Sequence, residues 1–528
     1  MKCRNLTDRL WAKDSTLWST NPDVQAKIQN RLGWLTSPNQ FLSRLSEITK
    51  FSAEIVQDGY QAVVLLGMGG SSLAPEVFAD TFKITNGLPL TVVDTTDPSS
   101  IAQAQQNLKL DQTLFIVSTK SGSTIETRSL FHHFYQLTKG NGDQFVAITD
   151  PGSKLVDLAE ECRFRSCFLN PVDIGGRYSV FSYFGLIPAS LIGIDLERLL
   201  KNAIGLDWQL AVDFGLDLAG HSLAGRDKMT LISSPRIDKL GCWVEQLIAE
   251  STGKDGKGIV PVDAEPVGVV NDYGADRIFV YIRLDNELDS QVGALKEAGF
   301  PVYQHDLSDL YDLGQSFLCW EIATAIAGAA LGINPFDEPN VRESKNSTTE
   351  ILNDFPTGTK LPEEECLFDG GGIQIYGTEP YPKGSIKKCL STFLSSAQLG
   401  DYAAIMAYTP SFGTPRTSGM FECIRGSIRR VYCLATTLGY GPRFLHSTGQ
   451  LHKGGANNGL FIQVTVDCPA VELPIPEAGY DFWTLKMAQA YGDLRALLDK
   501  GRRVIRIHIS GQDIETKIEK LAEVFEQL

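Results

Sequence analysis

Short apolar runs alternate with amphipathic segments along the first part of the chain. Apolar, partly β-branched runs at 62–66, 90–93, 114–117 and 145–149 have the length and composition of buried strands. Helical spacing of apolar residues follows them and is clearest at 125–137. Because strand and helix alternate, the pattern predicts an α/β fold with a parallel sheet covered on both faces.

The same alternation recurs further along the chain. Strands are expected at 229–233 and 278–284, and helices at 237–250 and 318–331. A run rich in Pro, Gly and Glu then reaches residue 365 and indicates a boundary. The two halves before it need not share sequence to be two copies of one fold.

A third region carries its own strand and helix patterns. Strands are expected at 402–408, 459–466 and 504–509, and helices at 385–396 and 483–498. The pattern therefore predicts an additional C-terminal α/β region.

These patterns divide the chain into four segments. We expect an amphipathic N-terminal helical arm at 1–40, two α/β domains at 41–205 and 206–350, and a C-terminal α/β domain at 351–528.

Composition narrows the class of partner. The net charge of -15 over 528 residues argues against nucleic acid and anionic membranes, but a local site can still bind a small anion. The most apolar runs are interrupted by polar residues or Pro and predict core helices, and the N-terminus lacks an apolar signal segment. Ten scattered cysteines with no C-x-x-C pair suit a reduced, cytoplasmic protein without a metal cluster.

A turn rich in hydroxyl groups separates the strand at 114–117 from the helix at 125–137. Thr119, Lys120, Ser121 and Thr124 lie in it, and Ser123 or Thr124 is a natural N-cap. Free backbone N–H groups at such a turn, and the positive end of a helix dipole, favour a phosphate dianion. An ordinary capped loop is the alternative. A Gly-rich turn at 67–72 follows another strand, and ligands of parallel sheets bind at the carboxyl ends of strands.

Three charged residues are candidates for chemistry. Glu250 lies on the apolar face of its helix, where desolvation would raise its pKa toward neutrality and suit a general base. From spacing alone, a helix-end Glu that reaches solvent or pairs with Lys254 is favoured. Arg177 follows two glycines and could clamp an anion or simply occupy a surface turn. Lys345 follows a Pro-rich turn, where a lysine is more often solvated.

Two of the seven histidines, His446 and His452, lie in one loop rich in glycine and hydroxyl groups. Such a composition is more typical of a site than of a core. Metal binding is the rival interpretation, but no nearby Cys or carboxylate completes a ligand set.

Four motifs occur in the order found in glucose-6-phosphate isomerases, and the chain resembles that family over nearly its whole length. They are Gly67-Met68-Gly69-Gly70-Ser71, the run from Thr119 to Thr127, Gly175-Gly176-Arg177-Tyr178-Ser179 and Gly332-Ile333-Asn334-Pro335-Phe336-Asp337. The resemblance is closest to the isomerase half of bifunctional transaldolase/glucose-6-phosphate isomerases, although no transaldolase portion is recognised. It implies two sugar-isomerase (SIS) domains, each a three-layer αβα sandwich with a parallel sheet, beside the C-terminal α/β region.

The resemblance also implies roles for individual residues. The expected phosphate-binding residues are Gly70, Ser71, Thr119, Lys120, Ser121 and Thr124. Glu250 would move a proton between C2 and C1, Arg177 would stabilise a cis-enediolate, and Lys345 would help to open the sugar ring. No cofactor is expected, the partner is a sugar phosphate, and a homodimer is expected.

The ring-opening histidine departs from the family pattern. Relatives place it between the catalytic Glu and Lys, where this chain has only His305 in an unrecognisable motif. His452 and His446 are preferred to His305.

Three other functions compete with glucose-6-phosphate isomerase. The enzyme could also act on mannose 6-phosphate, or the chain could be an SIS regulator that binds a phosphosugar without catalysis. A regulator would have no use for Glu250, Arg177 and Lys345 together. A glutamine-using aminosugar synthase would need an N-terminal nucleophilic Cys on an amidotransferase domain, which Cys3 on a short arm does not supply.

Overall fold

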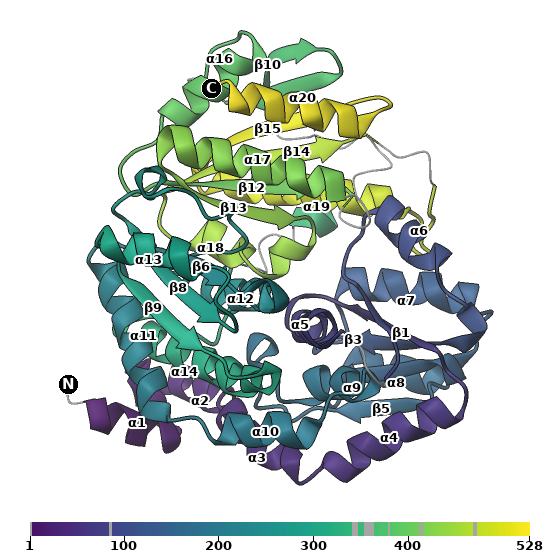
Figure 1. The fold of residues 1–528 in the computed structure, drawn as a ribbon. Coiled ribbons are helices and arrows are strands. Elements are labelled where there is room, and N and C mark those ends of the chain that lie inside the picture. The colour runs from purple at the N-terminus through teal and green to yellow at the C-terminus, as the bar shows by residue number, and fades with distance from the viewer. Residues whose placement is uncertain are drawn as a thin grey trace.

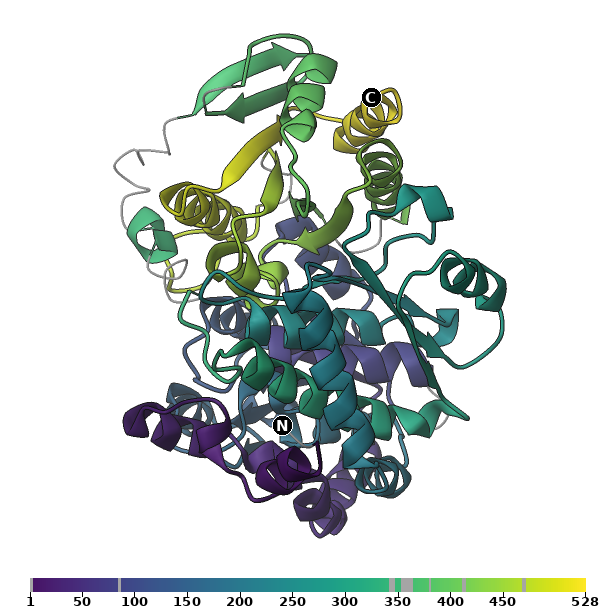
Figure 2. The ribbon, with the colours of Figure 1, turned by 90° about the vertical axis from the view of Figure 1, so that its left-hand side faces the viewer.

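The described residues form three β-sheets, each with its own helices (Figure 1). The computed structural model describes residues 3–83, 87–340, 347–352, 364–378, 381–410, 415–467 and 472–528. The first two units lie side by side, and the C-terminal unit sits above both in the two views (Figures 1 and 2).

The first sheet is parallel throughout and has the order β2-β1-β3-β4-β5. Its strands are β1 (Ala62–Gly67), β2 (Leu90–Val93), β3 (Thr113–Ser118), β4 (Phe145–Thr149) and β5 (Ser166–Leu169). From β1 the chain moves to one side to form β2, and then to the other side to form β3. The strand order therefore reverses between β1 and β3, which is where ligands bind in open α/β sheets.

Helices cover both faces of this sheet because its strands are apolar on both sides. Val63 and Leu65 of β1 point into one core, while Val64 and Leu66 point into another. The first core is shared with α4 (Leu45–Gln57), α5 (Leu73–Phe82) and α9 (Tyr183–Leu191), and the second with α6 (Pro98–Gln106), α7 (Ile125–Leu137) and α8 (Lys154–Glu161). The predicted three-layer αβα sandwich is confirmed.

The second sheet repeats this plan with four parallel strands in the order β7-β6-β8-β9. They are β6 (Lys228–Ser233), β7 (Val260–Val262), β8 (Arg277–Arg283) and β9 (Val302–Asp306). One face packs on α11 (Trp208–Leu223), α12 (Leu240–Thr252) and α14 (Leu313–Leu331), and the other on α13 (Asp289–Glu297). One core joins the first two units, and α5 and α12 face each other across their junction (Figure 1).

The C-terminal sheet is mixed, with the order β10-β11-β15-β14-β12-β13. Its parallel part contains β12 (Tyr402–Tyr408), β13 (Ala435–Tyr440), β14 (Gly459–Val466) and β15 (Arg503–Ile509); β10 (Glu365–Gly370) and β11 (Ile373–Gly377) add an antiparallel edge. Helices α16 (Ile386–Ser395), α17 (Pro415–Tyr432) and α20 (Ile514–Glu526) cover one face, and α19 (Phe482–Asp499) covers the other. This second face also meets Ala249 of α12, so the C-terminal unit packs against the helix that carries Glu250.

Sequence patterns identified the buried strands but missed the less regular elements. Strands β5 and β9 are half-exposed edge strands, and their residues lack a continuous apolar run. Two helices, α3 (Ser37–Leu42) and α4, cross the boundary predicted between residues 40 and 41 and lead into β1. The N-terminal arm, α1 (Cys3–Trp11) and α2 (Pro22–Gln29), packs on the second unit, where Trp18 Nε1 donates to the Ala325 carbonyl at 2.7 Å. The domain bounds themselves stay predictions.

Candidate active site

Two turns lie side by side at the carboxyl ends of the neighbouring strands β1 and β3. Gly67 and Ser118 are paired at the ends of these strands, and Ser118 Oγ donates to the Ser71 carbonyl at 2.9 Å. The Gly-rich turn and the hydroxyl-rich turn thus form one crevice at the point where strand order reverses.

The hydroxyl-rich turn leaves the start of α7 open. Thr124 is the N-cap residue, as predicted, but its hydroxyl caps no backbone N–H. It lies instead 2.9 Å from the Thr119 hydroxyl. The two hydroxyls are therefore adjacent at the positive end of a helix dipole, an arrangement suited to binding an anion.

Other members of the predicted phosphate site are placed differently. Ser121 is exposed and its hydroxyl lies 2.9 Å from the Ser123 hydroxyl, while Ser71 is buried. Lys120 forms an ion pair with Asp150, so part of its charge is already balanced. Thr119 and Thr124 are the hydroxyls that the structure brings together.

Gly70 allows a close approach that a side chain would prevent. A Cβ built there would lie 2.1 Å from the carbonyl oxygen of Gly176. The absence of a side chain brings the turn after β1 against the segment carrying Arg177.

Glu250 is buried in the last turns of α12, close to Arg177. Its Oε1 lies 3.5 Å from Arg177 Nη1, and its Oε2 accepts from Gln246 Nε2 at 3.2 Å. Burial raises the pKa of Glu250, and the charge of Arg177 only partly offsets this. Lys254, the alternative partner, instead donates to Asn334 O and Asp337. The structure thus favours the desolvated carboxylate over an exposed helix-end Glu.

Arg177 is fixed by its other donors. Its Nε donates to Ser251 Oγ at 2.8 Å, and Nη2 donates to the carbonyls of Pro335 and Asp337 at 2.7 and 2.9 Å. Nη1 bonds to Glu338 at 3.1 Å and also faces Glu250. Burial lowers the pKa of Arg177, but the carboxylates of Glu250 and Glu338 raise it above the ordinary value. A permanent, immobile positive charge therefore stands beside Glu250.

Lys345 lies outside the described residues. The segment that precedes it is tied to the C-terminal unit, since Asn340 N–H donates to Gln450 Oε1 at 2.9 Å. Gln450 Nε2 in turn donates to Asn340 Oδ1 and to the Gly253 carbonyl, at 2.7 and 3.0 Å.

The C-terminal unit delivers His446 to this crevice. His446 ends a short 3-10 helix, Arg443–His446, just after β13. Its Nε2 lies 2.8 Å from Glu126 Oε1, and its backbone oxygen accepts from Gln246 Nε2 at 2.7 Å. Glu126 also accepts from Gln489 Nε2 at 2.7 Å. One glutamine thus links His446 to Glu250.

Glu126, Gln246 and Gln489 were missed as site residues. Glu126 was visible only as a first-turn residue of the helix that follows Thr124. Its nearly complete burial at 3% exposure, unusual for a carboxylate, appears only in the folded chain.

The structure places His452 in an aromatic cluster of the C-terminal unit. Its ring packs against Phe444 and Phe461, with centroids at 5.9 and 5.1 Å, and neither nitrogen has a hydrogen-bond partner. Burial lowers its pKa well below the ordinary value. His305 lies on β9 of the second unit, where its ring packs against Phe214 and Trp320. His446 is the histidine whose ring nitrogen meets a carboxylate at the crevice.

The described part of the chain contains neither a metal-binding group nor a helix that could span a membrane. No cluster of three His, Cys, Asp or Glu side chains arranged to hold a metal ion occurs among the described residues. None of the helices in those residues is long and apolar enough to cross a membrane.

Known structures share this fold. A hypothetical protein from Thermus thermophilus superposes with a TM-score of 0.57 at 24% identity, covering 66% of this chain and 94% of that one. A glucose-6-phosphate isomerase from Chlamydia trachomatis gives 0.51 at 21%, covering 66% and 79%. These likenesses show the fold, which is of the SIS type with paired parallel sheets.

Sequence relatives include glucose-6-phosphate isomerases. The family model for phosphoglucose isomerase matches residues 47–212. A probable glucose-6-phosphate isomerase from Methanococcus maripaludis is 26% identical over 66% of this chain and 89% of its own length. A glucose-6-phosphate isomerase from Rubrobacter xylanophilus is 28% identical over 58% and 87%. The chain is thus similar to glucose-6-phosphate isomerases over about two thirds of its length, and the closer likeness to the bifunctional proteins stays an expectation.

Proposed function

We propose that this chain interconverts glucose 6-phosphate and fructose 6-phosphate, with Glu250 as the base that moves the proton between C2 and C1. The observation that supports this role is the buried Glu250 carboxylate held 3.5 Å from Arg177 at the crevice.

The phosphate group anchors the substrate at the start of α7. Thr119 and Thr124 offer adjacent hydroxyls, and the first turn of α7 offers N–H groups that the Thr124 side chain leaves uncapped. Such anchoring needs no cofactor, because the carbonyl of the open-chain sugar already acidifies the neighbouring C–H.

Proton transfer then uses the perturbed carboxylate. Glu250 takes the proton from C2 of the open-chain aldose, and the electron pair forms the C1–C2 double bond of a cis-enediolate. Arg177 stabilises the developing negative charge, since its guanidinium cannot move away or lose its proton. Glu250 returns the proton to C1, and a second proton passes from the C2 hydroxyl to the C1 oxygen, so that the C2 oxygen becomes the ketone and the C1 oxygen a hydroxyl.

His446, paired with Glu126, catalyses ring opening together with Lys345. Glu126 orients the imidazole and sets which nitrogen carries the proton. The other nitrogen of the ring is then available to exchange a proton with the ring oxygen of the sugar. His446 and Glu250 come from the same chain in this structure.

A coupled assay tests the function directly. Fructose 6-phosphate is supplied, and glucose 6-phosphate is detected by a dehydrogenase that reduces its nicotinamide cofactor. Turnover supports the enzyme, whereas phosphosugar binding without turnover would support the SIS regulator instead. Mannose 6-phosphate in the same assay decides whether the specificity is dual.

The assembly and the compartment belong to the same proposal. We expect a homodimer in the cytoplasm, and light scattering that showed an active monomer would contradict the first part. The eight cysteines whose side chains the structure describes are free thiols, which supports a reducing compartment.

A further inference from the structure

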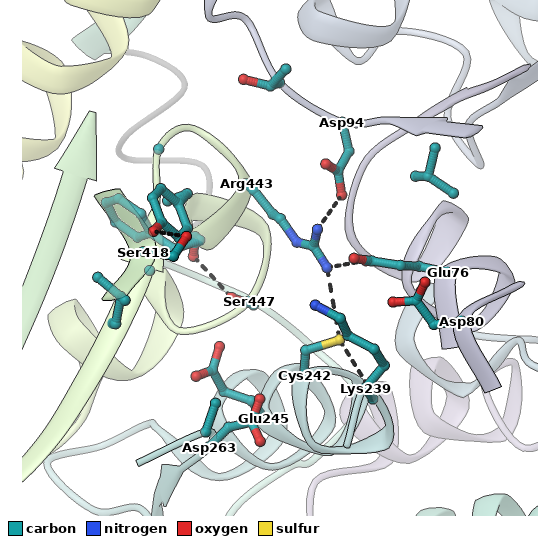
Figure 3. Close-up of a pocket in the computed structure, with 18 of the residues that line it drawn as sticks. Glu76, Asp80, Asp94, Lys239, Cys242, Glu245, Asp263, Ser418, Arg443 and Ser447 are labelled. Atoms are coloured by element: carbon teal, nitrogen blue, oxygen red, sulfur yellow. Dashed lines mark hydrogen bonds and ion pairs between the residues drawn. The ribbon is translucent and has the colours of Figure 1, made fainter. Parts of the chain in front are cut away.

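Arg443 lies where all three units of the chain meet. Its side chain borders a cavity of about 600 Å³ whose walls come from the first unit, the second unit and the C-terminal unit (Figure 3). The cavity lies beside the short helix Arg443–His446, which also carries the histidine of the proposed site.

The Arg443 guanidinium contacts both of the other units. Nη2 forms an ion pair with Glu76 on α5, and Nη1 lies 3.3 Å from Asp94 Oδ2 just after β2 (Figure 3). Nη2 also lies 3.7 Å from Cys242 Sγ on α12, the helix that carries Gln246 and Glu250.

Arginine suits this position better than lysine would. The planar guanidinium group contacts the carboxylates of Glu76 and Asp94 through two different nitrogens, whereas the ammonium group of lysine has only one nitrogen. Asp94 is only 3% exposed, and burial raises its pKa to about 6 despite the opposing charge of Arg443. Without the guanidinium, two carboxylates would face each other across a partly dry gap.

Arg443 and His446 fix the two ends of one helical turn. At its far end, the His446 ring meets Glu126 and its carbonyl meets Gln246. The turn is only four residues long, so a shift at Arg443 is transmitted directly to the imidazole.

We propose that Arg443 is a positioning residue for catalysis, which sets the imidazole of His446 against the sugar ring by clamping its helical turn to Glu76 and Asp94. This inference rests on the proposed function, in which His446 acts in ring opening. Arg443 itself does not contact the phosphate crevice residues Thr119 and Thr124 in the structure.

The test compares Arg443→Gln, Arg443→Lys and Arg429→Gln with the wild type. Misplacing a catalytic group by about 1 Å costs about 100-fold in rate, so kcat of Arg443→Gln should fall about 10- to 100-fold. KM should stay within about twofold, because the phosphate anchor is untouched. The kcat of Arg443→Lys should lie between those of the wild type and Arg443→Gln, since lysine keeps the positive charge but lacks the planar guanidinium group.

Arg429→Gln is the matched control for lost stability. Arg429 is buried, whereas Arg443 is half-buried, and Arg429 joins the C-terminal unit to Glu265 and Asp272 of the second unit. The Arg429→Gln substitution should therefore lower Tm but leave kcat unchanged. An equal loss of kcat in Arg429→Gln and Arg443→Gln would overturn the inference.

A double-mutant cycle separates positioning from a general structural role. If Arg443 acts through His446, then adding Arg443→Gln to His446→Ala should lower kcat by less than about twofold more. If the fold-losses in kcat of the two single variants instead multiply in the double variant, the inference is overturned. If Arg443→Gln does not fold, Glu76→Gln replaces it in the cycle, because it removes one side of the same clamp.

Failure of the proposed function has a different signature. A wild type without isomerase activity, or a fully active His446→Ala, would reject the function or the role of the histidine. An active, His446-dependent wild type with an unaffected Arg443→Gln would reject only the clamp.

Discussion

Glu250→Gln separates base catalysis from substrate binding. Gln has nearly the shape of Glu, so its side-chain oxygen can still accept from Gln246 Nε2, which lies 3.2 Å from the wild-type carboxylate, while the group that would accept the C2 proton is lost. Arg177 loses a charge 3.5 Å away but keeps Glu338, Ser251 and two carbonyls. The fold and the phosphate crevice should therefore survive.

The expected rate loss follows from the role. A positioned general base contributes about 10²- to 10⁴-fold, which corresponds to about 2.7–5.4 kcal/mol of transition-state stabilisation. The stability change should be small, about 1 kcal/mol, because losing the ion pair is offset by removing a buried charge. KM should stay close to the wild-type value.

The assay is the coupled reaction from fructose 6-phosphate, with binding of glucose 6-phosphate measured by calorimetry. Glu245→Gln is the matched control: it is the same change on the same helix, facing the cavity of Figure 3. Burial raises the pKa of Glu245 to about 8, so the neutral amide imitates its form at pH 7. Substantial activity in Glu250→Gln would refute the assignment.

The pH profile gives an independent check on Glu250. A general base works only when deprotonated, so kcat should fall as the pH drops through the pKa of Glu250. Since burial raises that pKa above 4.5, the acid limb should lie at higher pH than an exposed glutamate would produce. A flat profile down to pH 4.5 would contradict the argument.

Three further predictions concern the hydroxyl-rich turn, the histidines and the buried core. Thr124→Ala should raise KM by up to about tenfold with a smaller effect on kcat, because one anion-binding hydroxyl is worth about 1 kcal/mol; an unchanged KM would count against it. In steady-state assays His446→Ala should lower kcat, whereas His452→Leu should keep it, since that ring is packed in the core with unpartnered nitrogens; the reverse result would reject the choice of His446. Glu321 is fully buried and its pKa is raised well above 4.5, so its protonated form favours the folded state and this stability is lost as pH rises from about 4.5 toward the folded pKa. In urea unfolding, the free energy of unfolding of the wild type should lose about 1.4 kcal/mol per pH unit over this range because of Glu321, and Glu321→Gln should lack this loss. Identical pH slopes in the two proteins would disprove the prediction.

Buried strands were predictable because their physical signal is local. Continuous apolar runs such as 62–66 and 114–117 can be read directly from the residues, and so can the turn that follows each. Edge strands such as β5 and β9 carry a weaker signal, since only part of each is buried. Their pairing depends on neighbouring strands rather than on their own composition.

The sequence by itself determined the class of fold, the hydroxyl-rich turn and the candidacy of Glu250 and Arg177. Each of these depends on spacing within a few residues or on a short motif. Only the tertiary structure decided that Glu250 faces Arg177 rather than Lys254, and that His446 rather than His452 meets a carboxylate. Those partners are 73 to 320 positions apart in the chain, so no local pattern could pair them. Burial, which raises the pKa of Glu250, likewise arises only in the folded chain, where α12 packs against both neighbouring units.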